Sequence, residues 1–246
     1  MTMNHDDPLL PAGPQPLNRD SYDAIASAWD AARRCLDERE AGWLLDLVRG
    51  LRPPAPVLDL GCGSGRPLGE WLLARGLQVT GIDQSARLLA LARTRLPQGR
   101  WLEADIGGWI PDTDTDTDTD TDTDTDTDTD KNFAAVLIWD ALFHLPRALH
   151  LPLLARIFRL LQPGGRLLLS SGGSAQPAFT DTMHGARFFY DALAPDVLLA
   201  GLLDLGFGLE RIEYLNPPTR GRDKGRIAVL ARRPAAAPAT VPHAAE

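Results

Sequence analysis

The stretch VLDLGCGSG, residues 57–65, holds alternating glycines at Gly61, Gly63 and Gly65 after a short apolar run. Glycines at such positions allow a sharp backbone turn and leave no side chain between the main chain and a ligand. A loop of this kind, leading from a strand into a helix, binds nucleotides through main-chain N–H groups. An acid, Asp59, precedes the glycines. The stretch therefore predicts a site for a nucleotide-type cofactor, built on this acid and the three glycines.

Two better-known glycine loops do not fit this stretch. The dinucleotide fingerprint G-x-G-x-x-G fails, because Arg66 and Leu68 stand where a third glycine is required. The start of the following helix also lacks the Lys-Ser or Lys-Thr pair of a phosphate-binding P-loop. An NAD(P)-dependent oxidoreductase stays a weaker alternative, since it would share the same alternation of strands and helices.

Two histidines are candidates for a general base. A base is needed if a hydroxyl or a protonated amine is to react, and histidine is the side chain most often used. His144 is the first candidate and His184 the second. His144 stands between Phe143 and Leu145, so the alternative is a residue that only packs or caps a turn.

The elements that must position these residues alternate along the chain. Short apolar runs predict strands within 53–60 and at 77–83, 100–105, 132–140, 166–172, 209–215 and 225–233. Helical spacing of apolar residues predicts helices at 21–51, with Ser21 as the cap, and at 66–76, 84–97, 147–161 and 194–207. Mostly apolar strands that alternate with helices indicate a parallel sheet covered on both faces. The last two strands lack a helix between them, which allows an antiparallel pair at one edge.

The glycine loop resembles motif I of class I S-adenosylmethionine-dependent methyltransferases, D/E-x-G-x-G-x-G. The resemblance continues in order over residues 20–233, through Asp83, WLEAD, AAVLIWDALFHL and LLQPGGRLLLS. It implies an α/β fold with a doubly wound, mostly parallel seven-stranded sheet whose last strand is antiparallel. Helices would cover both faces, and an N-terminal helical cap would close the site. It also implies S-adenosylmethionine as cofactor and O- or N-methylation of a small molecule by in-line displacement.

The resemblance also assigns roles to individual residues. Asp83 would bind both ribose hydroxyls, as a carboxylate is suited to do, and Asp105 would lie near the adenine amino group. Arg33 or Arg34 would pair with the cofactor carboxylate, or else lie on a solvated helix face. The complete set expected to bind the cofactor is Asp59, Gly61, Cys62, Gly63, Gly65, Asp83, Gln84, Asp105, Ile106, Trp139 and Arg33.

The acceptor is expected beyond the carboxyl ends of the strands, where ligands bind in parallel α/β sheets. Trp139, Asp140 and His144 follow the fourth strand there, and residues 170–191 would form a lid. Phe188, Phe189 and Tyr190 would line the acceptor pocket or anchor that lid. In similar small-molecule methyltransferases, N-terminal helices close the other side. Here such helices carry Tyr22, Trp29, Arg33 and Arg34.

A run of alternating threonine and aspartate occupies residues 112–130. Its aspartates repel one another and it has no apolar residue to bury, so we expect a disordered insertion in a loop. Specific calcium binding is a weaker alternative, because the run has neither the turn glycine nor the closing glutamate of an EF-hand loop. The ten aspartates also account for the formal net charge of −8, and the rest of the chain carries a small positive charge.

Composition narrows the remaining possibilities. We expect a single domain at 19–234, with a helical cap at 19–52 and disordered tails at 1–18 and 235–246. The near-neutral body predicts neither nucleic acid nor membrane as a partner. Cys35 and Cys62 suit neither a disulfide framework nor a zinc site, so no metal is expected. A cytoplasmic location is the default. A protein that binds the cofactor without catalysis is the alternative function.

Overall fold

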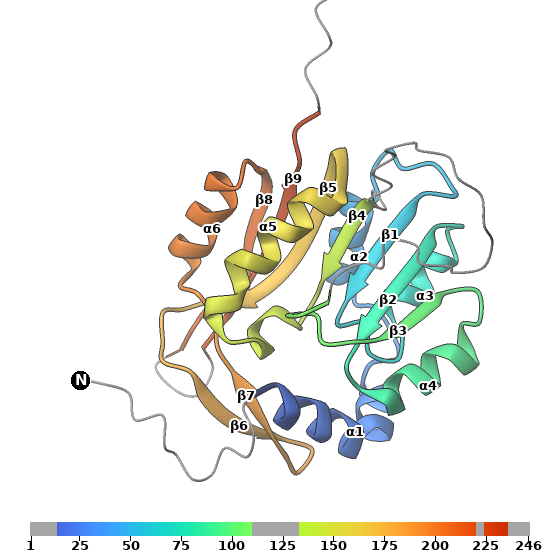
Figure 1. The fold of residues 1–246 in the computed structure, drawn as a ribbon, viewed down its shortest axis with the longest axis vertical. Coiled ribbons are helices and arrows are strands. Elements are labelled where there is room, and N and C mark those ends of the chain that lie inside the picture. Colours follow the sequence, from blue (N-terminus) through green and yellow to red (C-terminus); the bar gives the residue numbers. More distant parts are fainter. Residues whose placement is uncertain (1–13, 110–132, 220–223, 236–246) are drawn as a thin grey trace, which may run out of the picture.

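Figure 1 shows the computed structural model of the chain, which describes residues 14–109, 133–219 and 224–235. A seven-stranded sheet forms its centre, in the order β3-β2-β1-β4-β5-β9-β8. The strands are β1 (Pro56–Leu60), β2 (Gln78–Asp83), β3 (Arg100–Glu103), β4 (Phe133–Ile138), β5 (Leu161–Gly172), β8 (Gly208–Asn216) and β9 (Arg226–Arg232). β1 to β5 pair in parallel, and β9 is antiparallel to both β5 and β8. The predicted fold class is confirmed, including the antiparallel pair at one edge.

Helices cover the two faces of the sheet (Figure 1). They are α1 (Pro14–Ala32), α2 (Glu38–Leu47), α3 (Leu68–Leu73), α4 (Ala86–Arg95), α5 (His150–Leu160) and α6 (Pro195–Asp204), with 3-10 turns at Leu142–His144 and Arg147–Leu149. Apolar residues of α5 and α6 share one buried cluster with Val136 and Ile138 of β4. Those of α2, α3 and α4 share the other cluster with Ala135 and Leu137. Alternate residues of β4 thus face opposite layers, which explains why the whole strand is apolar.

The N-terminal region differs from the single helix expected at 21–51. It forms two helices, because the side chain of Asp37 accepts a hydrogen bond from Glu40 N (2.7 Å) and starts α2 anew. α1 begins at Pro14, so residues 14–18 belong to a helix and not to the expected tail. Ser21 lies inside α1 and is not its cap. The sequence predicts a cap at 19–52; in the structure α1 lines the site through Tyr22 and Trp29, whereas α2 packs on the sheet.

A two-stranded hairpin forms within residues 170–191, the segment expected as a lid. It consists of β6 (Phe179–Met183) and β7 (Ala186–Tyr190). α1 runs beside β7 (Figure 1). The buried Asn18 side chain donates to Phe189 O (3.1 Å) and accepts from Phe189 N (2.8 Å), while the Ser21 hydroxyl donates to Arg187 O. The hairpin is therefore fastened to α1 by main-chain hydrogen bonds that need no particular side chain on β7.

α4 fastens the opposite side of α1. Two hydrogen bonds of 2.8 and 2.9 Å join the guanidinium of Arg95 to the carboxylate of Asp30. The Ser85 hydroxyl at the start of α4 donates to Asp23 Oδ1 (2.6 Å). α1 consequently bridges the carboxyl edge of the sheet between α4 and the hairpin.

The Thr-Asp run at 112–130 lies outside the described residues, as do residues 1–13 and 236–246 of the expected tails. No helix in the described part of the chain is long and apolar enough to cross a membrane.

Trp101 on β3 supports the glycine loop from below. Its side chain is 6% exposed, and its ring lies so close to Gly65 and Gly81 that a Cβ there would come within 2.9 and 2.4 Å of it. Its indole N–H donates to Leu96 O (2.8 Å). The ring thus fills the space that these two glycines leave open.

We expect Trp101→Ala to lower the free energy of unfolding by about 3–5 kcal/mol, because it opens a cavity and removes a buried hydrogen bond. Denaturant titration measures the change. Trp71→Ala is the matched control, since the Trp71 ring is only partly buried at the edge of the core and also stacks on Arg75, so a clearly smaller loss is expected. Equal losses in the two variants would contradict the supporting role of Trp101.

Candidate active site

The glycine loop connects β1 to α3 at the carboxyl edge of the sheet. Gly61 and Gly63 have φ of +78° and +55°, a region that side chains other than glycine rarely adopt. A Cβ on Gly61 would lie 2.3 Å from Ala141 Cβ. Gly61 N and Cys62 N both donate to Ile82 O, at 2.8 and 3.1 Å. The loop is thereby held against the end of β2, with its main chain exposed to the cleft above it.

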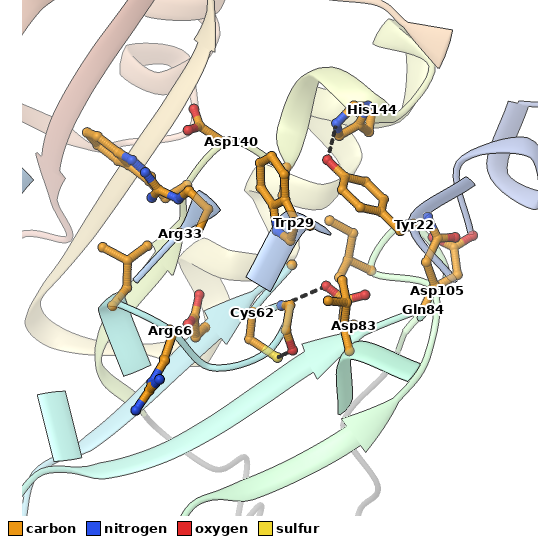
Figure 2. A pocket seen from close by; sticks show the side chains of 18 of the residues that line it. Tyr22, Trp29, Arg33, Cys62, Arg66, Asp83, Gln84, Asp105, Asp140 and His144 are labelled. Atoms are coloured by element: carbon orange, nitrogen blue, oxygen red, sulfur yellow. Dashed lines mark hydrogen bonds between the residues drawn. The ribbon is translucent and has the colours of Figure 1, made fainter. Parts of the chain in front are cut away.

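Asp83, the last residue of β2, joins the loop to α4. Its Oδ2 accepts from Gly63 N (Figure 2), and its Oδ1 accepts from Ser85 N, both at 2.8 Å. Burial raises the pKa of Asp83, while the hydrogen bonds from Ser85 and Gly63 oppose that rise. Each carboxylate oxygen can accept more than one hydrogen bond, so capacity is left for a ribose diol.

Asp59 lies beneath the loop and is 2% exposed. Burial, together with the nearby charge of Asp83, raises its pKa to about 7. Burial and the charge of Asp83 thus disfavour the negative form of Asp59 at the floor of the cleft.

Asp105 and Ile106 form the far end of the cleft after β3. Asp105 Oδ1 accepts from Gly107 N (2.9 Å), which leaves its other oxygen to face a ligand. Arg156 of α5 donates to Ile106 O (2.8 Å) and Gly107 O (3.2 Å). This segment is therefore held in place from the opposite layer.

A cleft with about 830 Å³ of empty space runs between these segments and α1. The expected cofactor residues that line it are Arg33, Asp59, Gly61, Cys62, Gly63, Asp83, Gln84, Asp105, Ile106 and Trp139. Gly65 does not line it and instead packs against Trp101 and Leu96. A cradle of bare main chain beside the buried carboxylate of Asp83 fits S-adenosylmethionine.

α1 supplies the roof of the cleft. Tyr22, Trp29 and Arg33 point into it, as expected of the closing helix, while Arg34 is exposed and does not line it (Figure 2). Arg33 donates to Glu40 Oε1 (2.9 Å), and the Trp139 indole N–H donates to the same oxygen (3.1 Å). The charge of Arg33 is therefore largely balanced by Glu40.

Asp140 follows β4 and stands at one end of the cleft. Its φ of +55° is unusual for a residue other than glycine. The Ser170 hydroxyl donates to its Oδ1 (2.9 Å), and the Arg226 guanidinium pairs with the same oxygen at 2.8 Å. Backbone strain at a residue fixed in this way is typical of functional sites.

His144 and Tyr22 form a hydrogen-bonded pair at the same end (Figure 2). His144 Nδ1 is 3.0 Å from the carbonyl oxygen of Phe189 and must donate to it. Nε2 is then an acceptor, and the Tyr22 hydroxyl donates a hydrogen bond to it, with 2.8 Å between Oη and Nε2. Burial lowers the pKa of His144 to about 4 and raises that of Tyr22 well above its usual value. Both groups are therefore neutral at pH 7.

His184 does not belong to this site, contrary to the sequence prediction. It is exposed at the turn between β6 and β7, with φ of +49°, and is not among the residues that line the cleft. Its neighbour Gly185 has φ of +83°, so the pair forms the tight turn of the hairpin. Of the hairpin aromatics, Phe188 is fully buried against Tyr22, and Tyr190 lies half-buried beside His144.

Several lining residues had no sequence signal of their own. Leu88 comes into the cleft because Ser85 caps α4 and turns the first helical residues toward the loop. Arg66 and Leu68, which only served to exclude a dinucleotide loop, also line it. Glu40 accepts a hydrogen bond from Arg33, and Asn18 donates one to the carbonyl oxygen of His144. No periodic pattern in the sequence reveals these contacts.

Comparisons with known proteins agree with this geometry. Residues 57–165 match the family described as Methyltransferase domain. The chain is 35% identical over 147 residues to Trans-aconitate 2-methyltransferase of Sinorhizobium medicae (strain WSM419), which covers 57% of this chain and 48% of the relative. The chain thus spans about half the length of this curated relative.

Solved structures share the fold at low identity. The DhpI-SAH complex superposes with a TM-score of 0.66 at 21% identity, over 92% of this chain and 99% of that one. The [4+2]-cyclase SpnF gives a TM-score of 0.61 at 18% identity, over 88% and 95%. The matched segment, residues 57–165, carries the glycine loop, Asp59 and Asp83 and belongs to the methyltransferase-domain family, and the chain as a whole has the fold of class I S-adenosylmethionine-dependent methyltransferases.

Proposed function

We propose that this chain transfers a methyl group from S-adenosylmethionine to an oxygen or nitrogen atom of a small molecule, by in-line displacement. The observation that carries the proposal is the continuity of one cleft from Asp83 and the glycine loop to Tyr22, Asp140 and His144. A cofactor site and a polar acceptor end thus share one space. Bound there, the cofactor supplies a methyl group that is already activated as a sulfonium.

The residues of the chain have three tasks in this reaction. Asp83 holds the ribose, Asp105 and Ile106 hold the adenine, and the main chain of Gly61 and Gly63 supports the methionine portion. α1 excludes water through Tyr22 and Trp29. Fixing donor and acceptor in line, away from water, supplies most of what methyl transfer requires.

The Tyr22–His144 pair offers a route for a proton. As a hydroxyl acceptor is methylated, its proton passes to Tyr22 Oη while the tyrosine proton passes to His144 Nε2. The low pKa of His144 favours such a concerted transfer over prior removal of the proton. Tyr22 is thus the group that touches the acceptor, and His144 acts through it.

The curated relative's name favours a second kind of acceptor, a carboxylic acid. A carboxylate is already deprotonated at neutral pH, so the proton route would be unnecessary. The fold does not choose between these chemistries, since the cyclase SpnF shares it.

The first prediction concerns the cofactor. We expect S-adenosylhomocysteine to raise the thermal midpoint of the wild-type chain and NAD to leave it unchanged, because ligands that bind the native state stabilise it. Gly63→Leu should weaken S-adenosylhomocysteine binding at least about 10-fold, since φ of +55° disfavours a side chain that would also enter the cleft. Calorimetry on Gly108→Ala is the control, because nothing lies within 4 Å of a Cβ there. Unchanged affinity of Gly63→Leu would reject the site.

The second prediction concerns pH. The pKa of Asp59 is about 7 in the folded chain and about 4 when unfolded, so the folded state holds an extra proton between these values. The contribution of Asp59 to the stability of the ligand-free protein therefore falls as pH rises from 4 to 7, whereas that of His144, whose pKa is lowered to about 4, rises over the same range.

Asp59→Asn mimics the protonated form. It should raise the thermal midpoint by about 3 °C or more at pH 8 and have little effect at pH 5. Asp20→Asn, at an exposed position, should change neither value. A gain of equal size at both pH values would contradict the role of the Asp59 proton.

The third prediction separates the acceptor classes. Transfer of labelled methyl groups is measured for hydroxyl, amine and carboxylate acceptors, trans-aconitate included. For a hydroxyl acceptor, Tyr22→Phe should lower turnover about 100-fold or more, because the proton route is lost. For a carboxylate, a loss below about 10-fold is expected, because no proton is moved. Tight S-adenosylhomocysteine binding without transfer to any acceptor would overturn catalysis and favour a cofactor-binding protein.

A further inference from the structure

A second cavity, open to solvent, lies beside the acceptor end of the cleft. It is bounded by the turn after β4, the end of β5, the hairpin and the start of β9. The two cavities are separated by paired side chains. Asp140 of the cleft contacts Arg226 of the second cavity at 2.8 Å, and the rings of His144 and Tyr190 lie 4.9 Å apart.

One wall of this cavity is aromatic. Phe179 and Tyr190 stack with ring centroids 5.2 Å apart and an angle of 17° between the rings. Phe143 approaches Tyr190 at 5.9 Å. A flat apolar group fits beside such a wall, because stacked rings present an extended face.

The other wall carries charge. Lys224 and Arg226 line it together with Asp181 and Asp191. Asp191 is already engaged, since it accepts from Arg147 N (2.7 Å) and Arg147 Nε (2.6 Å). One terminal nitrogen of the Arg226 guanidinium pairs with Asp140. The guanidinium has further donors, so it can bind a second anion at the same time.

Two buried polar atoms on residues of this cavity have no partner. Within the described residues, Arg226 Nε and Gln176 Oε1 are buried and make no hydrogen bond. Leaving such atoms unsatisfied is costly, and in native structures they commonly point to a ligand or water. Arg226 Nε requires an acceptor oxygen, and Gln176 Oε1 requires a hydrogen-bond donor.

We propose that this second cavity is a subsite for a planar, conjugated organic acid that carries a carboxylate and a hydrogen-bond donor. The carboxylate binds Arg226, the planar body stacks on Tyr190, and the donor binds Gln176. As an acceptor subsite it rests on the proposed methyl transfer, and Arg226 then links acceptor recognition to Asp140 in the cleft.

4-Hydroxycinnamate has these three features and is the probe, titrated by calorimetry against the full chain with saturating S-adenosylhomocysteine. We expect binding to the wild type and a loss of at least 10-fold in Arg226→Gln. Arg187→Gln is the matched control, since this exposed arginine lies on β7 outside both cavities, and less than a 2-fold change is expected. Absence of binding to the wild type, or equal affinity for wild type and Arg226→Gln, would overturn the subsite.

Gln176→Leu provides a second test that does not disturb the Asp140 ion pair. It should remove the preference for 4-hydroxycinnamate over cinnamate and leave cinnamate affinity within 2-fold. A preserved preference would reject the donor contact. Binding of S-adenosylhomocysteine is titrated separately. A chain that binds 4-hydroxycinnamate but not S-adenosylhomocysteine would support the subsite and overturn the proposed function.

Discussion

The carboxylate of Asp83 joins the segments that surround the cofactor side of the cleft. It ends β2, accepts from Gly63 N of the glycine loop and accepts from Ser85 N at the start of α4. Ser85 in turn donates to Asp23 of α1. A continuous series of hydrogen bonds therefore runs from the sheet to the roof. Buried and partly buried hydrogen bonds thus connect the glycine loop, α4 and α1 around the cofactor side of the cleft.

The acceptor end depends on a different principle, which is the docking of the hairpin on α1. Asn18 binds the main chain of Phe189 and also the carbonyl of His144. Phe189 O then sets the tautomer of His144, which decides that Tyr22 donates to it. The positions of Tyr22 and His144 thus follow from one buried amide, although these residues are more than a hundred positions apart in the chain.

Trp101 and Arg226 show how packing and chemistry meet in this molecule. Trp101 fills the space below glycines that must lack side chains, so the loop can be open toward the ligand and closed toward the core. Arg226 stands between two cavities and balances Asp140 on one side. In both cases a large side chain on a strand supports a neighbouring loop of the site. Sites at the edge of a rigid sheet depend on such support.

The sequence alone determined the parallel sheet, the glycine loop and the acids at the strand ends, because apolar runs, turn glycines and their order are local properties. Asp59, Asp83 and Asp105 could be placed for the same reason: the carboxyl ends of parallel strands meet at one edge. Only the tertiary structure decided that His144 and not His184 enters the cleft, that Gly65 packs on Trp101, and that the region expected as a lid forms a hairpin. Those outcomes depend on contacts between α1, the hairpin and the β4 turn, and distant contacts leave no periodic trace in the chain.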